Sequence, residues 1–266
     1  MKMKKSTKII TVLISIAVVL ILWIAFCGYQ WSWGPFAKLH DVRTSKMPGN
    51  DISYSPDNQQ VDPVDELKGK KIVFLGSSVT YGAASKGISF ADYISKKNDC
   101  EMTKEAVSGT TLVDDLPDSY ISRLKKIKDT EADLFICQLS TNDATQKKGL
   151  GQVSDSQDMD DFDTHTVAGA IEYTIAYARD RWDCPVIFYT NSRYNSDRYA
   201  QMVKLLYDIA DKWDVNIIDM YSDDDFNNIS DEERSLYMAD SIHPTQAGYQ
   251  KWWTPYMEDK LVEFLR

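Results

Sequence analysis

Residues 72–78 have the sequence IVFLGSS, in which four large apolar residues run directly into a glycine and two serines. A short apolar run that ends in turn residues is typical of a buried β-strand. The next residues, VTYG at positions 79–82, lead toward a helix, so we expect Ser78 at the end of a rigid strand with its hydroxyl accessible. This stretch predicts an α/β fold with a candidate nucleophile at the edge of its sheet.

A histidine and an aspartate lie three residues apart near the end of the chain. Residues 240–244 are DSIHP, which places Asp240 and His243 just before the last predicted helix. A serine, an imidazole base and a carboxylate that orients the base are the groups that nucleophilic acyl transfer requires.

Two further segments end predicted strands in residues that the same chemistry can use. Residues 105–109, EAVSG, end in Gly109, and residues 134–143, LFICQLSTND, end in an Asn-Asp pair that begins at Asn142. Two backbone N–H groups and an Asn amide would stabilise the negative oxygen of a tetrahedral intermediate.

These four segments, in this order, resemble the SGNH (GDSL-like) hydrolase family, and the resemblance covers residues 70–266. It implies that Ser78 is the nucleophile, His243 the base and Asp240 the orienting acid. It also implies an oxyanion hole made by the backbone amides of Ser78 and Gly109 and the side chain of Asn142. The reaction it implies uses no metal and no organic cofactor.

Two positions depart from the family pattern: Ser77 stands where an Asp is usual, and Ser140 stands where a Gly is usual. Neither change removes a group that bonds the reacting atoms, so both bear on rate and substrate range. Each segment alone also has a simpler interpretation, since Gly and Ser favour turns and Asn142 could be a helix N-cap. Their common position at the carboxyl edge of an open α/β sheet favours the catalytic interpretation.

Strand and helix patterns alternate along the rest of the domain. Further strands are predicted over residues 184–190 and 215–220, and helices over residues 90–94, 116–127, 167–182, 199–213 and 246–264. This alternation predicts a parallel sheet that is covered on both faces. The resemblance implies a three-layer, flavodoxin-like sheet of five strands in the order 2-1-3-4-5.

The N-terminus carries Lys2, Lys4, Lys5 and Lys8, followed by residues 9–26 without an ionisable side chain. As a helix this segment would be about 27 Å long, close to the hydrocarbon core of about 30 Å. The positive-inside rule places the lysines in the cytoplasm and the domain outside the cell. We therefore expect a single-pass transmembrane helix in the cell membrane.

The main alternative to this anchor is a cleaved signal peptide, or one that leaves a lipid-modified Cys27. Phe26 disfavours both, because small residues are expected next to a cleavage site. Trp31, Trp33 and Phe36 follow at once, as aromatic residues often do at the outer membrane boundary.

The sequence thus divides into four parts: a basic cytoplasmic stub over residues 1–8, a transmembrane signal anchor over residues 9–29, an extracellular tether over residues 30–67 and an SGNH hydrolase domain over residues 68–266. The tether contains proline and aspartate with little periodicity, which fits a flexible tether or an extension wrapped on the domain.

The charge of the chain excludes nucleic acid as a partner. The net charge is −10, and without the four N-terminal lysines 26 basic residues stand against 40 acidic ones, a net charge of −14. Such a field repels anionic polymers. Acidic runs at residues 155–163 and 223–225 lack the ligand spacing of a calcium loop, and the four cysteines lack disulfide or zinc spacing, so no metal site is expected.

The sequence predicts a membrane-anchored, outward-facing serine esterase. The expected location favours O-acyl groups on cell-envelope or extracellular glycans. The acidic insertion at residues 145–163 offers no apolar lid for long chains, which favours short acyl groups, above all O-acetyl groups. Tyr81, Arg193, Tyr194 and Asn195 follow strand ends and are candidates for the substrate rim. An acyltransferase of the same fold and a non-catalytic surface binding domain are the alternatives.

Overall fold

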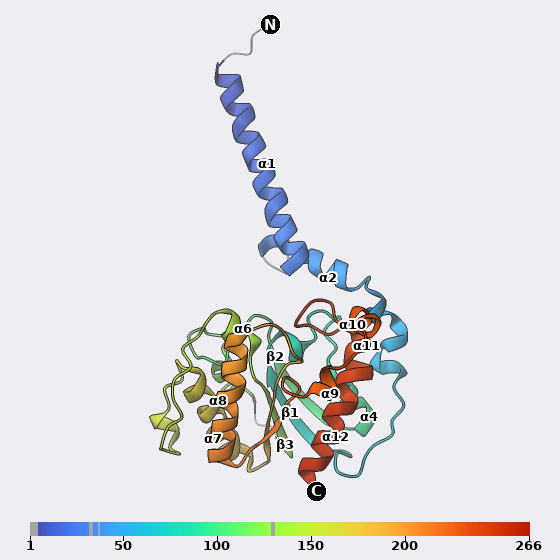
Figure 1. Cartoon of the computed structure of the whole chain (residues 1–266), viewed down its shortest axis with the longest axis vertical. Helices are drawn as coiled ribbons and strands as arrows, with labels where there is room; N and C mark the ends of the chain where they lie inside the picture. The colour runs from blue at the N-terminus through green and yellow to red at the C-terminus, as the bar shows by residue number, and fades with distance from the viewer. Residues whose placement is uncertain (1–4, 32–33, 37, 129–130) are drawn as a thin grey trace. The chain divides into compact units, whose positions relative to one another are not determined.

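A computed structural model describes residues 5–31, 34–36, 38–128 and 131–266 of the chain (Figure 1). The chain forms two compact units, Met1–Met47 and Pro48–Arg266. The first unit contains helix α1 (Lys5–Trp31), the short helix η1 (Gly34–Phe36) and helix α2 (Lys38–Thr44).

Helix α1 is long and apolar enough to cross a membrane. Its span Lys8–Tyr29 has 22 residues and contains an 18-residue stretch with a mean hydropathy of 3.1, none of which is buried within the structure. At about 1.5 Å per residue such a span matches the hydrocarbon core of about 30 Å, and a signal sequence near an N-terminus would meet the same criteria. Lys2, Lys4 and Trp33, which belong to the predicted stub and membrane boundary, lie outside the described residues.

The second unit is built on a sheet of five parallel strands in the order β2-β1-β3-β4-β5. The strands are β1 (Lys71–Gly76), β2 (Glu101–Ala106), β3 (Leu134–Gln138), β4 (Val186–Tyr189) and β5 (Asn216–Ile218). The predicted flavodoxin-like sheet and its strand order are confirmed. Strand β1 lies between β2 and β3, and β2 ends at Ala106, three residues before Gly109.

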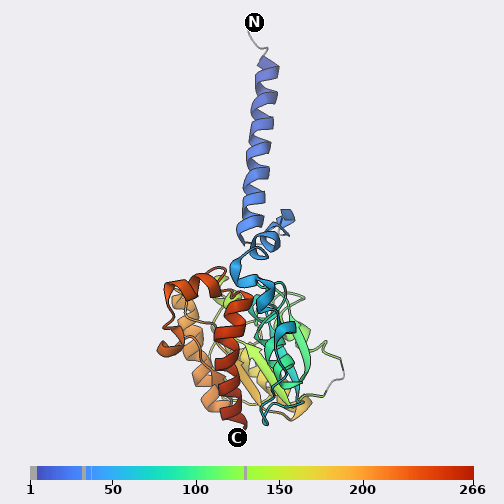
Figure 2. The same ribbon diagram turned by 90° about the vertical axis from the view of Figure 1, so that its right-hand side faces the viewer.

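Helices cover both faces of this sheet, as the alternation of strands and helices predicted (Figure 1). Val73 and Leu75 of β1 pack in one core with α7 and α8, whereas Ile72 and Phe74 pack in a second core on the other face. Successive side chains of a strand point to opposite faces, so a continuous apolar run supplies both cores. Figure 2 shows the C-terminal helix, in red, running along the second face.

The helices of the second unit are α3 (Ser78–Tyr81), α4 (Phe90–Asn98), α5 (Tyr120–Leu124), α6 (Thr141–Thr145), α7 (Val167–Trp182), α8 (Asp197–Trp213), α9 (Asp224–Asn227), α10 (Asp231–Tyr237), α11 (Gln246–Gly248) and α12 (Thr254–Leu265). Four short 3-10 helices and one π-helical turn complete it: η2 (Pro48–Asn50), η3 (Ile52–Tyr54), η4 (Pro56–Asn58), η5 (Met159–Asp161) and the π turn η6 (Tyr249–Trp253).

Two predicted helices differ from the observed ones. The helix expected over residues 116–127 is the short α5, because Ser119 accepts a hydrogen bond from the Ser122 amide at 3.0 Å and so caps a helix that begins at Tyr120. The closing helix expected over residues 246–264 is divided into α11, the π turn η6 and α12.

From Pro48 onward the expected tether is a wrapped extension of the second unit. Asn50 is buried, its Nδ2 donates to the Ala84 carbonyl at 2.6 Å, and its Oδ1 accepts from the Gln246 amide at 2.8 Å. Leu67 is fully buried in the second core. The compact unit therefore begins at Pro48, twenty residues before the predicted domain boundary at residue 68.

Candidate active site

The end of strand β1 places Ser78 at the start of helix α3. The turn between them needs a glycine at position 76, because a Cβ atom there would lie 1.7 Å from Oγ1 of Thr80. As the first residue of a helix, Ser78 has a backbone N–H that no carbonyl of the same helix accepts. The strand end thus presents both a hydroxyl and an amide at the carboxyl edge of the sheet.

A bridged loop holds Asp240 and His243. Met238 and Pro244 form an isolated antiparallel bridge, and the Ala239 amide donates to the His243 carbonyl at 2.9 Å. Oδ1 of Asp240 also accepts from the backbone amides of Ile242 and His243, each at 2.8 Å. The carboxylate thereby organises the loop that carries the imidazole.

The structure brings Ser78, His243 and Asp240 together, although 165 residues separate the serine from the histidine. His243 Nε2 lies 2.8 Å from Ser78 Oγ, and His243 Nδ1 lies 2.9 Å from Oδ2 of Asp240. With its proton on Nδ1, the imidazole donates to Asp240 and accepts from the serine hydroxyl. This geometry suits transfer of the serine proton to Nε2.

Asp240 remains ionised over the physiological pH range. Desolvation raises the pKa of its carboxyl, but the hydrogen bond and charge of His243 and the amides of Ile242 and His243 outweigh that effect and hold the pKa well below its ordinary value. An ionised carboxylate favours the Nδ1 tautomer of the imidazole and stabilises the imidazolium that forms when the serine loses its proton.

Gly109 and Asn142 follow the ends of β2 and β3 at the same edge of the sheet. Gly109 is exposed and adopts the left-handed conformation, with a φ of 85°, which favours glycine. Nδ2 of Asn142 donates to the carbonyl of Thr110 at 2.9 Å. An amide NH₂ has two hydrogens, so this contact fixes the group and leaves its second hydrogen for another acceptor.

Ser140, at one of the two positions that depart from the family pattern, caps helix α6. Its Oγ accepts from the amides of Asn142 and Asp143 at 3.2 and 3.4 Å. Asp143 is buried, and its carboxylate accepts from the amides of Leu112 at 2.8 Å and Val113 at 3.1 Å. Burial raises the pKa of Asp143, while these hydrogen bonds oppose the rise. Both residues fix the segment that carries Asn142.

Gln138 occupies the space beside Ser77 and belongs to no motif of the sequence. Its Oε1 accepts from the Ser77 amide and from Thr80 Oγ1, both at 2.9 Å. Thr80 Oγ1 also lies 2.6 Å from the hydroxyl of Tyr189. Gln138 is fully buried at the end of β3, so a polar residue closing an apolar strand was the signal that could have identified it.

The candidate rim residues lie in two places. Tyr81 is exposed on α3, three residues after Ser78. Arg193, Tyr194 and Asn195 line one pocket of about 520 Å³, whose walls do not include the Ser78 triad. The Arg193 guanidinium is engaged there, because Nη1 forms an ion pair with Asp224 at 2.7 Å and Nε donates to a backbone carbonyl.

Among the described residues, no group of three or more His, Cys, Asp or Glu side chains could hold a metal ion. All four cysteines are free thiols.

A model of the "GDSL-like Lipase/Acylhydrolase family" matches residues 74–251, which include all five proposed catalytic and oxyanion residues. No curated protein sequence matches this chain.

Three solved structures illustrate the similarity of fold. A protein from Lactobacillus plantarum is 20% identical, with a TM-score of 0.63 over 74% of this chain and 98% of that one. A family two carbohydrate esterase from Clostridium thermocellum, in complex with cellohexaose, is 15% identical, with a TM-score of 0.51 over 76% and 66% of the two chains. An acetyl xylan esterase is 14% identical, with a TM-score of 0.51 over 71% and 98%.

Proposed function

This chain belongs to the GDSL-like lipase/acylhydrolase family and is a serine ester hydrolase, and we propose that it removes O-acetyl groups from glycans at the outer face of a membrane. The observation that carries the catalytic part is the contact of 2.8 Å between Ser78 Oγ and His243 Nε2, with Asp240 on the other side of the imidazole.

In the proposed reaction, His243 Nε2 takes the proton of Ser78 as Oγ attacks the ester carbonyl. The amides of Ser78 and Gly109 and the side chain of Asn142 donate to the resulting oxyanion. When the tetrahedral intermediate collapses, the C–O bond to the alcohol breaks and His243 returns its proton to the leaving alcohol oxygen. Water then attacks the acyl carbon with His243 again as base, the bond from that carbon to Ser78 Oγ breaks, and His243 returns its proton to Oγ as the acid leaves.

The preference for a short acyl group follows from the insertion after the Asn142 segment. Phe162 is buried in the core beside α7 and α8, and Leu150, Val153 and Met159 pack against the same core. The apolar side chains of the insertion therefore face inward, where they cannot line a groove for a long acyl chain. A long acyl chain binds favourably only where its CH₂ groups are buried, which contributes about 0.8 kcal/mol for each group.

The glycan part of the proposal draws on similarity and on α1. Two proteins of similar fold are named as a carbohydrate esterase with a bound cello-oligosaccharide and as an acetyl xylan esterase. Helix α1 has the length and hydropathy of a membrane anchor, and lysines precede its apolar part. By the positive-inside rule an anchor with this orientation holds the catalytic unit outside the cell, where acetylated glycans are found.

Labelling by a fluorophosphonate tests the nucleophile directly. The full-length protein in detergent should be labelled at Ser78 and should hydrolyse p-nitrophenyl acetate, whereas Ser78→Ala should do neither. Labelling that persists in Ser78→Ala would contradict the assignment.

Product analysis on acetylated xylan or cello-oligosaccharides then tests the substrate. Released acetate supports the proposal, and acetate that appears on an added sugar acceptor would identify a transferase. Cleavage of the nitrophenyl ester with no acetate released from any glycan would refute the glycan assignment alone.

A further inference from the structure

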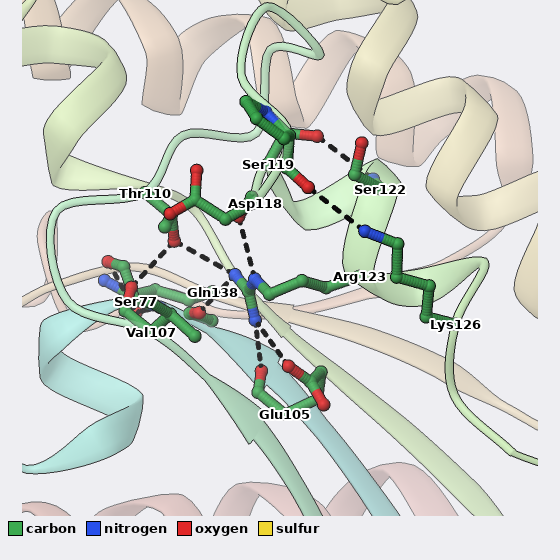
Figure 3. A network of polar contacts seen from close by, with 12 residues as sticks. Ser77, Glu105, Val107, Thr110, Asp118, Ser119, Ser122, Arg123, Lys126 and Gln138 are labelled. Atoms are coloured by element: carbon green, nitrogen blue, oxygen red, sulfur yellow. Dashed lines mark hydrogen bonds and ion pairs between the residues drawn. The ribbon is translucent and has the colours of Figure 1, made fainter.

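Arg123 of helix α5 is a buried cation beneath the candidate oxyanion hole. Only 6% of the residue is exposed. Figure 3 shows its guanidinium surrounded by oxygen atoms from separate parts of the chain. It donates hydrogen bonds to the Gly76 carbonyl at 2.8 Å, the Glu105 carbonyl at 2.9 Å, the Asp118 carbonyl at 2.9 Å, Thr110 Oγ1 at 3.0 Å and Glu105 Oε1 at 3.3 Å.

These partners support each of the three proposed oxyanion donors. Gly76 is the last residue of β1, two residues before the Ser78 amide. Thr110 directly follows Gly109, and its carbonyl accepts the hydrogen bond from Asn142 Nδ2 at 2.9 Å. One guanidinium therefore joins the ends of β1 and β2 to the loop on which Gly109 and Asn142 depend.

We propose that Arg123 is a positioning residue that holds the Ser78 amide, the Gly109 amide and the Asn142 side chain in one geometry. This inference rests on the proposed function, because it assigns a role in holding the oxyanion donors of that reaction. A rate gain from such donors requires that they be aligned before the charge develops. Arg123 supplies that alignment without touching the substrate.

The chemistry of the guanidinium explains why arginine occupies this position. Its five N–H groups diverge in a plane, so it can donate to several fixed oxygens at once, whereas a lysine ammonium is a compact point donor. Within the part of the chain that the structure describes, one carboxylate contacts it: that of Glu105, which is partly exposed and lies 3.3 Å from Nη1. Burying a charged group costs free energy unless its hydrogen bonds are made, and an apolar residue would fill the same space without that cost.

The test compares Arg123→Met and Arg123→Lys with Arg181→Met. Arg181 is a matched control because its Nη2 donates to the carbonyls of Ile127 and Lys128, both at 3.0 Å, away from the candidate site. In the full-length protein, Arg123→Met should lower kcat for acetyl ester hydrolysis by about 10–100-fold with KM changed less than about threefold. Arg123→Lys should recover little of this loss, and Arg181→Met should leave kcat unchanged.

Thr110→Val keeps the Arg123 cation and removes its hydroxyl partner, so this variant provides a second test of the positioning role if Arg123→Met does not fold. It should lower kcat several-fold, and the double variant with Arg123→Met should lose little more than Arg123→Met alone, since Arg123→Met has already removed the contact with Thr110 Oγ1.

Unchanged kcat in Arg123→Met or Thr110→Val, or a loss that lies in KM alone, would overturn the positioning role while leaving the esterase intact. A wild-type protein that neither labels with fluorophosphonate nor hydrolyses acetyl esters would instead contradict the proposed function, and this inference with it.

Discussion

Asn142 has one amide hydrogen engaged with the Thr110 carbonyl and a second that the proposed mechanism assigns to the oxyanion. A donor used only in the transition state affects turnover and leaves substrate binding nearly unchanged. We expect Asn142→Ala to lower kcat by about 10²–10³-fold with KM almost unchanged in steady-state ester hydrolysis. A raised KM with normal kcat would show that Asn142 is a substrate contact.

Asp240 should make the stability of the protein depend on pH in the acid range. Because its pKa is lower in the folded chain than in the unfolded one, its contribution is present above about pH 4 and is lost as the pH falls toward the folded pKa. Between about pH 5 and pH 3, the Tm of the wild-type protein should therefore fall further than the Tm of Asp240→Asn. Parallel Tm curves for the two proteins would contradict this expectation.

Among the elements, the extension over residues 48–67 joins two segments that follow the candidate triad residues: the loop after α3 and the start of α11. Asn50 donates to the Ala84 carbonyl, in the loop that follows α3, and accepts from the Gln246 amide, three residues after His243. The Lys86 ammonium also donates to the Asn50 carbonyl at 2.6 Å. The extension therefore belongs to the framework of the site.

Asn50→Ala should destabilise the protein by about 1–3 kcal/mol, because it leaves the Ala84 carbonyl and the Gln246 amide without their partner in a buried place. Chemical denaturation monitored by fluorescence measures this change. Asn58→Ala is the matched control, since Asn58 is exposed and its hydrogen bond to the Ile52 carbonyl stays within the extension. Equal losses in both variants would refute the bridging role of Asn50.

At the scale of the whole molecule, the inward-facing insertion predicts selectivity for short acyl groups. Acetyl esters should be cleaved with a higher kcat/KM than octanoyl or longer esters of the same alcohol. A p-nitrophenyl ester series from two to twelve carbons measures this directly. Activity that rises steadily with chain length would refute the acetyl preference and leave the triad unaffected.

The membrane arrangement gives the last prediction. If α1 is an uncleaved anchor, protein recovered from membranes should begin near Met1, and protease added outside intact cells should release the second unit. We expect the cuts to fall before Pro48, because the extension beyond it is packed on the catalytic unit. A mature N-terminus at or just after Cys27 would contradict the anchor.

The class of fold and the segments of the candidate site could be predicted from the order of amino acids alone. Apolar runs such as residues 72–76 are buried on both faces, and this local signal is sufficient to predict parallel strands between helices. Ser78, Gly109, Asn142 and the DSIHP segment at residues 240–244 follow those strands or precede the last helix, so their order along the chain indicated a common edge. The strand order came from the family resemblance.

The contacts that hold these residues in place could be seen only in the folded chain. Arg123, Gln138 and Asn50 have no motif of their own, and their partners lie far away in sequence: Gly76 for Arg123, Ser77 for Gln138 and Gln246 for Asn50. Periodicity reports which face of an element is buried, whereas the partner of a buried polar group depends on which strand ends meet in space. For that reason the candidate reacting groups could be identified from the sequence, whereas the residues that support them could not.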